Sequence, residues 1–103
     1  MTGRFYMVTF DLIGSKGREN DYAKARGALR FLVGEGNYWD LVKQCAIVRT
    51  NKDARVIMNS LTQSLGLECN ILVVRLRRGY AFRLRDVGKR AKARDCLQQI
   101  PSL

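Results

Sequence analysis

The spacing of apolar residues changes several times along this chain. The order of these changes restricts which folds the chain can form. Runs rich in aromatic and β-branched residues predict strands, and stretches whose apolar residues recur every three or four positions predict helices. The predicted strands are residues 4–13, 37–41, 44–50 and 70–76. The predicted helices carry apolar stripes at Tyr22, Ala25, Leu29 and Leu32, and at Ala54, Ile57, Met58, Leu61 and Leu65. One uninterrupted strand up to Thr50 is the alternative to the two middle strands.

With 103 residues, the chain can bury one core but not a second, so residues 1–103 are expected to form a single domain. The order strand, helix, strand, strand, helix, strand is that of two split βαβ units. It predicts an α+β fold of the ferredoxin-like type: a βαββαβ sandwich of four antiparallel strands with two helices on one face. We expect this core over about residues 4–77, followed over about residues 78–103 by an extra strand or arm and a basic helix.

Short motifs predict where the helices begin and end. Asn20 or Asp21 can cap the first helix, and Thr50 and Asp53 have the spacing of a capping box at the start of the second. Gly66 is placed to close the second helix. The final basic helix is expected to follow a capping Asp at position 86 and to end near residue 101.

The positive charge of the chain is concentrated near its C-terminal end. The chain has 19 Lys and Arg against 9 Asp and Glu, a net charge of +10. Residues 75–94 contain one acidic residue, and their basic residues are Arg75, Arg77, Arg78, Arg83, Arg85, Lys89, Arg90, Lys92 and Arg94. A solvated surface is one explanation, but a solubilising surface would mix the signs. The segment therefore predicts contact with a phosphate backbone, and Tyr80 and Phe82 within it could stack on bases.

The absence of histidine excludes several classes of enzyme. A chain with no His has no Ser-His-Asp or Cys-His nucleophile pair and no His-ligated zinc site. Cys45, Cys69 and Cys96 form no CxxC pair, so we expect reduced thiols in a cytoplasmic protein, with Cys45 as a small core residue. No apolar run reaches the roughly 18 residues of a membrane span, and no membrane partner is expected.

Three stretches resemble one known family. Residues 8–12 (VTFDL), residues 38–41 (YWDL) and residues 44–50 (QCAIVRT) resemble the SinR-like branch of the CRISPR-associated Cas-two family, and the likeness extends over about residues 4–85. The resemblance implies a ferredoxin-like domain that forms a homodimer and lends C-terminal strand segments across it. It also implies that Asp11 of each protomer could hold Mg²⁺ for phosphodiester cleavage, as an endoribonuclease or endodeoxyribonuclease.

Three functions follow as hypotheses. The first is a homodimer that binds DNA or RNA through residues 75–94. It is favoured because two features of the family's catalytic pattern are unmatched. Residues 14–18 lack the family's paired arginines, and Ala46 replaces its Ser. The second is a Mg²⁺-dependent endonuclease that uses Asp11, although an Asp at a strand end also commonly accepts backbone N–H bonds from the following turn. The third is a small inhibitory protein of a mobile element or toxin–antitoxin system, acting on an acidic protein or a nucleoprotein.

Overall fold

The chain forms a mixed α+β structure. The computed structural model describes residues 3–12, 19–42, 44–66, 69–77 and 85–100. In chain order, these residues form β1 (Arg4–Leu12), α1 (Glu19–Val33), the 3₁₀ turn η1 (Glu35–Asn37), β2 (Tyr38–Val42), β3 (Cys45–Thr50), α2 (Ala54–Leu65), β4 (Cys69–Arg75) and α3 (Val87–Leu97). None of the helices in the described ranges is long and apolar enough to cross a membrane. The extra strand or arm expected near residues 78–84 lies outside the described residues.

The four strands form one sheet in the order β2-β3-β1-β4, and every neighbouring pair is antiparallel. It follows that β1 and β2 run parallel with β3 between them, and that β3 and β4 run parallel with β1 between them. The helix α1 connects β1 to β2, and α2 connects β3 to β4. Each βαβ unit therefore has one strand of the other unit between its own two strands. The middle runs of the sequence are two strands, β2 and β3, rather than one.

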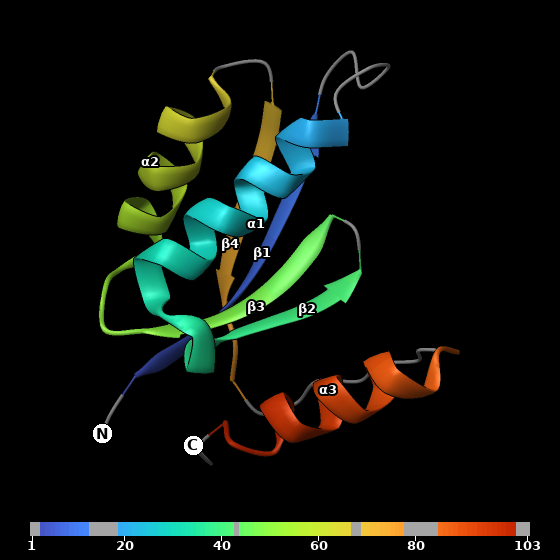
Figure 1. Cartoon of the computed structure of the whole chain (residues 1–103). Coiled ribbons are helices and arrows are strands. Elements are labelled where there is room, and N and C mark those ends of the chain that lie inside the picture. The colour runs from blue at the N-terminus through green and yellow to red at the C-terminus, as the bar shows by residue number, and fades with distance from the viewer. Residues whose placement is uncertain (1–2, 13–18, 43, 67–68, 78–84, 101–103) are drawn as a thin grey trace.

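One face of the sheet, here called the inner face, is covered by α1 and α2 (Figure 1). Because side chains alternate along a strand, Tyr6, Val8 and Phe10 of β1 all point to this face, and all three are buried. The buried core there also contains Tyr22, Ala25, Leu29, Tyr38, Ala46, Val48, Ile57, Leu61 and Leu65. The apolar stripes predicted for the two helices thus pack on the sheet, except for Met58, which is not part of this cluster.

The opposite, outer face is only partly covered. A second apolar cluster lies where α3 packs on it, formed by Phe5, Ile47, Ala93, Cys96, Leu97 and Ile100, with Trp39, Leu41 and Leu76 packed against it. On β4, Leu72 and Val74 point to the same face but remain 56% and 38% exposed. The apolar run of β4 is therefore shielded on the inner face and open on the outer face.

The first helix begins earlier than its predicted cap. It starts at Glu19, which places Asn20 and Asp21 inside its first turn, so neither is the N-cap. Asp21 in the first helical turn complements the positive end of the helix dipole, which favours a helix that begins before it. The helix ends before Gly34, whose φ of +89° is one that glycine adopts without strain.

The second helix is capped by Asp53 and not by Thr50. The Asp53 carboxylate accepts the backbone N–H of Val56 at 3.0 Å. Thr50 remains the last residue of β3, and its hydroxyl accepts the N–H of Lys52 at 3.1 Å, in the turn before the helix. Gly66 closes the helix as predicted, with a φ of +77°.

The cysteines are free thiols in different surroundings. Cys45 is only partly buried, which contradicts its prediction as a core residue. Its place in β3 explains the difference, because it points to the outer face, opposite Thr9, beyond the part that α3 covers. The cysteine in a core is Cys96, where burial and, secondarily, the neighbouring Asp95 carboxylate raise the pKa to about 12.

Candidate nucleic-acid interface

The basic helix α3 has a well-defined start. The Asp86 carboxylate accepts the backbone N–H of Lys89 at 2.9 Å, as expected for an N-cap. The backbone carbonyl of Asp86 accepts the N–H of Arg90 at 2.9 Å and begins the helical ladder. A Cβ at Gly88 would lie 3.3 Å from the capping carboxylate, so the glycine leaves room for the cap.

Apolar residues and two polar contacts fix α3 to the sheet. Ala93 and Cys96 are fully buried and Leu97 is 5% exposed, which makes one face of the helix part of the second cluster. The indole N–H of Trp39 donates to the Asp95 carboxylate at 3.3 Å. A guanidinium nitrogen of Arg49 donates to the side-chain carbonyl of Gln99 at 3.1 Å. The orientation of α3 is thus set from both β2 and β3.

Arg49 is a structural cation under α3. Its Nε donates to the Asn37 side-chain oxygen at 2.9 Å, and its Cζ lies 5.7 Å and 5.9 Å from the ring centres of Phe5 and Trp39. A guanidinium held over two rings gains cation–π attraction in addition to its hydrogen bonds. No motif predicts this role, because the groups that Arg49 contacts are far from it in the chain.

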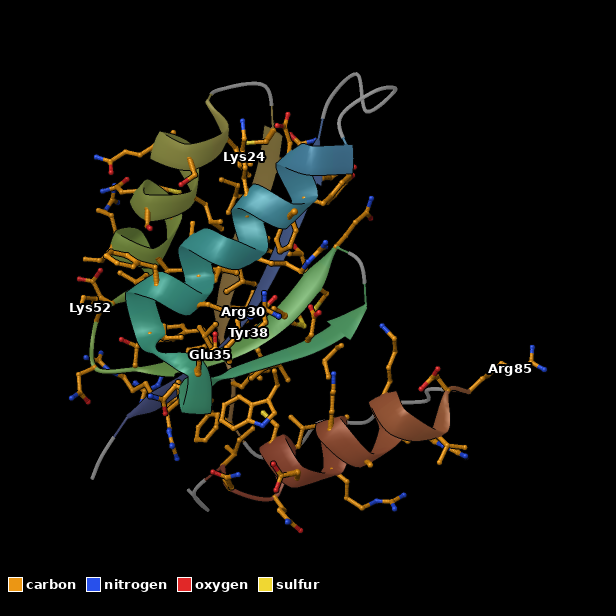
Figure 2. All side chains as sticks on the ribbon, viewed as in Figure 1. Lys24, Arg30, Glu35, Tyr38, Lys52 and Arg85 are labelled. Atoms are coloured by element: carbon orange, nitrogen blue, oxygen red, sulfur yellow. The ribbon has the colours of Figure 1, made fainter. Side chains whose placement is uncertain are left out.

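The outward side of α3 presents unpaired positive charge. Arg90 and Arg94 lie one turn apart on one flank, whereas Lys92 lies on the other flank, because two residues span about 200° around a helix. All three are exposed, as is Arg85, which projects away from the sheet at the start of the helix (Figure 2). Within the part of the chain that the structure describes, none of the four forms an ion pair. The two nearby acids, Asp86 and Asp95, already serve as the cap and as the acceptor for Trp39.

The remaining predicted basic residues do not all join this surface. Lys89 is partly buried, and Arg75 and Arg77 are exposed at and beyond the end of β4. Arg75 lies opposite Tyr6 in the sheet and so belongs to the inner side, on the same side of the strand as Val73, as the alternation predicted. Since α3 packs on the outer face, the strand and the helix carry their arginines on different sides of the sheet. The other predicted contacts, Arg78, Tyr80, Phe82 and Arg83, lie outside the described residues.

Asp11 lies at a second surface, a shallow hollow of about 130 Å³ near the end of β1. The hollow is lined by Thr9, Phe10, Asp11, Gln44, Asn70 and Leu72. Asn70 lies directly opposite Asp11 in the pairing of β1 with β4. The sequence did not predict this neighbour, because the register of two strands so far apart in the chain is set by the packing of the whole sheet. The turn in which Asp11 could accept backbone N–H groups lies outside the described residues.

The hollow offers oxygen atoms but few charges. Asp11 is exposed, and Thr9, Gln44 and Asn70 line the same space. The side-chain amide of Gln44, however, donates to the Tyr22 hydroxyl at 2.9 Å. Oxygen ligands are those that Mg²⁺ prefers. Among the described residues, however, no group of three or more His, Cys, Asp or Glu side chains could hold a metal ion. Asp11 is the one carboxylate among the residues that line the hollow, so a metal ion there would need further ligands from outside the described residues.

The basic surface of α3 and the hollow at Asp11 are separate. Phe5, near one end of β1, packs under α3, whereas Asp11 lies near the other end of the same strand. No family model, no curated protein and no solved structure matches this chain.

Proposed function

We propose that this protein binds nucleic acid through the outward side of α3. The observation that carries the proposal is a set of exposed cations, Arg85, Arg90, Lys92 and Arg94, without ion-pair partners among the described residues, on a helix fixed to the sheet. Neutralising phosphates with such side chains releases condensed counterions and drives association. Because α3 is anchored by packing and by hydrogen bonds from Trp39 and Arg49, little ordering of the helix itself is needed on binding.

The expected mode of binding is contact with the backbone and not with base edges. Guanidinium groups make bidentate hydrogen bonds to phosphate oxygens, and such contacts position a protein on nucleic acid without reading its sequence. The flanks of α3 hold the cations, while Ala91 and Gly88 on its outward side leave room for close approach. We therefore expect binding with little sequence preference and with a strong dependence on salt.

We further propose that the core is ferredoxin-like and that the protein acts as a homodimer of the Cas-two-like class. The element order up to β4 and the strand order β2-β3-β1-β4, with two helical crossovers on one face, support the fold. The homodimer and the class rest on the sequence resemblance.

The binding experiment compares two pairs of basic residues. Fluorescence anisotropy with labelled single-stranded and duplex oligonucleotides is measured from 50 to 200 mM salt, where contact with about five phosphates would weaken binding on the order of 10² to 10³-fold. The double variant R90Q and R94Q should lower the slope of log affinity against log salt by about 1.8 for duplex DNA. The matched control is K52Q and R55Q, two exposed cations at the start of α2, and Lys52 lies away from α3 in Figure 2.

Three results would contradict this proposal. Binding that does not depend on salt would exclude a phosphate interface, and equal losses in the two double variants would show that only net charge matters. A partner protein that stays bound to the wild-type chain after nuclease treatment, and is lost in R90Q and R94Q, would instead support an inhibitory protein that binds an acidic surface.

A second candidate function is Mg²⁺-dependent endonuclease activity at the hollow. The observation in its favour is that the exposed residue Asp11 lines the hollow together with the polar residues Thr9 and Asn70. In a homodimer, Asp11 of both protomers would hold the ion, which would stabilise charge at the reacting phosphate. The test is cleavage of labelled RNA and DNA with Mg²⁺ or with a chelator, comparing the wild-type chain with D11N and with E35Q as a control at another exposed carboxylate. Cleavage that persists in D11N would contradict this function.

A further inference from the structure

The outward side of α1 carries one large apolar side chain with nothing packed on it. Phe31 is 93% exposed, more than Leu72, Val74 or any other exposed large apolar residue described. It lies two residues after the buried Leu29, and so about 200° around the helix from the side that packs on the sheet. A phenylalanine in this position contributes nothing to the core of the single chain.

Gly27 lies one turn before Phe31 on the same side of α1. A Cβ built at Gly27 would meet no atom within 4 Å, and its φ is not positive, so neither space nor backbone conformation requires glycine there. Glycine in a helix interior costs about 1 kcal/mol relative to alanine. Two locally unfavourable residues thus stand one turn apart, a protruding ring at Phe31 and a notch at Gly27.

A two-fold axis would make these two residues complementary. We infer that a second copy of this chain packs its α1 antiparallel against α1, so that Phe31 of each copy fills the notch at the partner's Gly27. In a two-fold interface, if residue i of one copy contacts residue j of the other, then j contacts i in return. A knob and a notch one turn apart satisfy this condition when the axis passes between them.

The charges along α1 are compatible with the same antiparallel arrangement. In a pair centred between Gly27 and Phe31, residue 24 of one copy lies opposite residue 34 of the other, next to Glu35. The side chains of Lys24 and Glu35 are 65% and 85% exposed, and each pairs within its own chain, Lys24 with Asp21 at 3.6 Å and Glu35 with Arg30 at 4.0 Å. Figure 2 shows Lys24 toward one end of α1 and Glu35 beyond the other end. Residues 19–37 contain three acidic and three basic residues, so two copies can meet here without the repulsion that α3 would produce.

This interface is independent of the proposed nucleic-acid site. The helix α1 covers the inner face of the sheet, whereas α3 packs on the outer face, so pairing through α1 leaves Arg90 and Arg94 free. It also differs from a dimer that joins C-terminal strand segments or the open part of the outer face. Variants of α1 therefore test it without disturbing the basic surface.

Sedimentation velocity over a concentration series of the full chain measures the proposed association. The wild-type chain should approach twice the monomer mass, and F31A should raise the dissociation constant by about tenfold or more. The variant G27L should raise it similarly, although replacing glycine by leucine should stabilise the helix of the monomer. The matched control L72A removes an exposed side chain from the outer face and should leave the dissociation constant unchanged.

Exchanging the knob and the notch gives the sharpest test. The double variant G27F and F31G should dimerise again, because each new Phe at position 27 faces a glycine at position 31 of the partner. A wild-type chain that stays monomeric at all concentrations would overturn the inference, as would association that is unaffected by F31A or lost in L72A. Failure of nucleic-acid binding in a chain that still dimerises would count only against the proposed function.

Discussion

The two faces of the sheet are covered by helices of different kinds. On the inner face, α1 and α2 connect strands of the same sheet and bury Phe10, Leu29 and Leu61 almost completely. On the outer face, α3 follows the last described strand and packs on a smaller cluster. The inner helices are needed to build the sheet topology, whereas α3 is added to a sheet whose strands are already connected. The layer that builds the larger core is therefore distinct from the layer that carries the proposed binding surface.

The comparison predicts its largest effect at the centre of the inner layer. Phe10 is 1% exposed and its ring centre lies 6.1 Å from that of Tyr22, so F10A should lower the free energy of unfolding by about 4 kcal/mol. Urea denaturation measures the loss. The control V87A, at a side chain that is 70% exposed, should change stability by less than about 0.5 kcal/mol. Similar losses in the free energy of unfolding for the two variants would contradict the expected difference between the buried and the exposed position.

A smaller and more local effect is expected under α3. Leu97 is 5% exposed in the second cluster, and L97A should cost about 2 to 3 kcal/mol, mainly by loosening α3. Hydrogen exchange should show lost protection in α3 while the amides of β1 and β3 keep theirs. Trp39, the only tryptophan, donates to Asp95 and should report the change by its fluorescence. Equal loss of protection throughout the sheet would show that the two layers unfold together.

The buried thiol of α3 predicts a dependence of stability on alkaline pH. Burial, assisted by the Asp95 carboxylate, raises the pKa of Cys96 from 9.0 to about 12, so the unfolded chain loses this proton first as the pH rises. The contribution of the neutral thiol is complete below about pH 9 and declines between pH 9 and 12, by about 1.4 kcal/mol per pH unit. Urea denaturation at pH 8 and pH 10 should show a smaller decline for C96A than for the wild-type chain. Parallel declines would contradict the burial of this thiol.

The smallest expected effects come from the two aspartate caps. Asp53 and Asp86 each accept a backbone N–H at the start of their helices, at 3.0 Å and 2.9 Å. Removing either cap should cost its helix about 1 kcal/mol. D53A should lower the global free energy of unfolding, because α2 is part of the inner layer. D86A should mainly reduce the helicity of α3, measured by circular dichroism. A larger loss in the global free energy of unfolding for D86A than for D53A would contradict the view that α2, and not α3, belongs to the layer that determines stability.

Much of the local structure could be predicted from apolar spacing. The strand predicted over residues 4–13 is observed as Arg4–Leu12, and the stripe of Tyr22, Ala25 and Leu29 is the buried side of α1. These predictions succeeded because burial imposes its own period on a strand or helix. The caps were less predictable, since Thr50 and Asp53 are both good capping residues and the strand that holds Thr50 decided between them.

The candidate sites depended on tertiary structure that the sequence does not contain. The nine clustered basic residues marked α3 as a surface of interest, but their division between two sides of the sheet follows from where α3 packs. The neighbours of Asp11, Asn70 and Gln44, come from two other segments, and no motif links them. Arg49 was not recognised either, because its contact with Trp39 depends on the pairing of β2 with β3, and its contact with Gln99 forms only when α3 lies on the sheet.

The edges of the sheet bear on how this protein behaves when it is concentrated. The pairing of β2 with β3 is irregular between Asp40 and Val42, and α3 packs beside β2, so that edge is poorly suited to adding a strand. Within the described residues, β4 pairs only with β1, which leaves its other edge free beside the exposed Leu72 and Val74. Arg75 at the end of this strand, together with the net charge of +10, opposes edge-to-edge aggregation by repulsion. Salt screens that repulsion, so a solution of high ionic strength leaves the β4 edge least protected against aggregation.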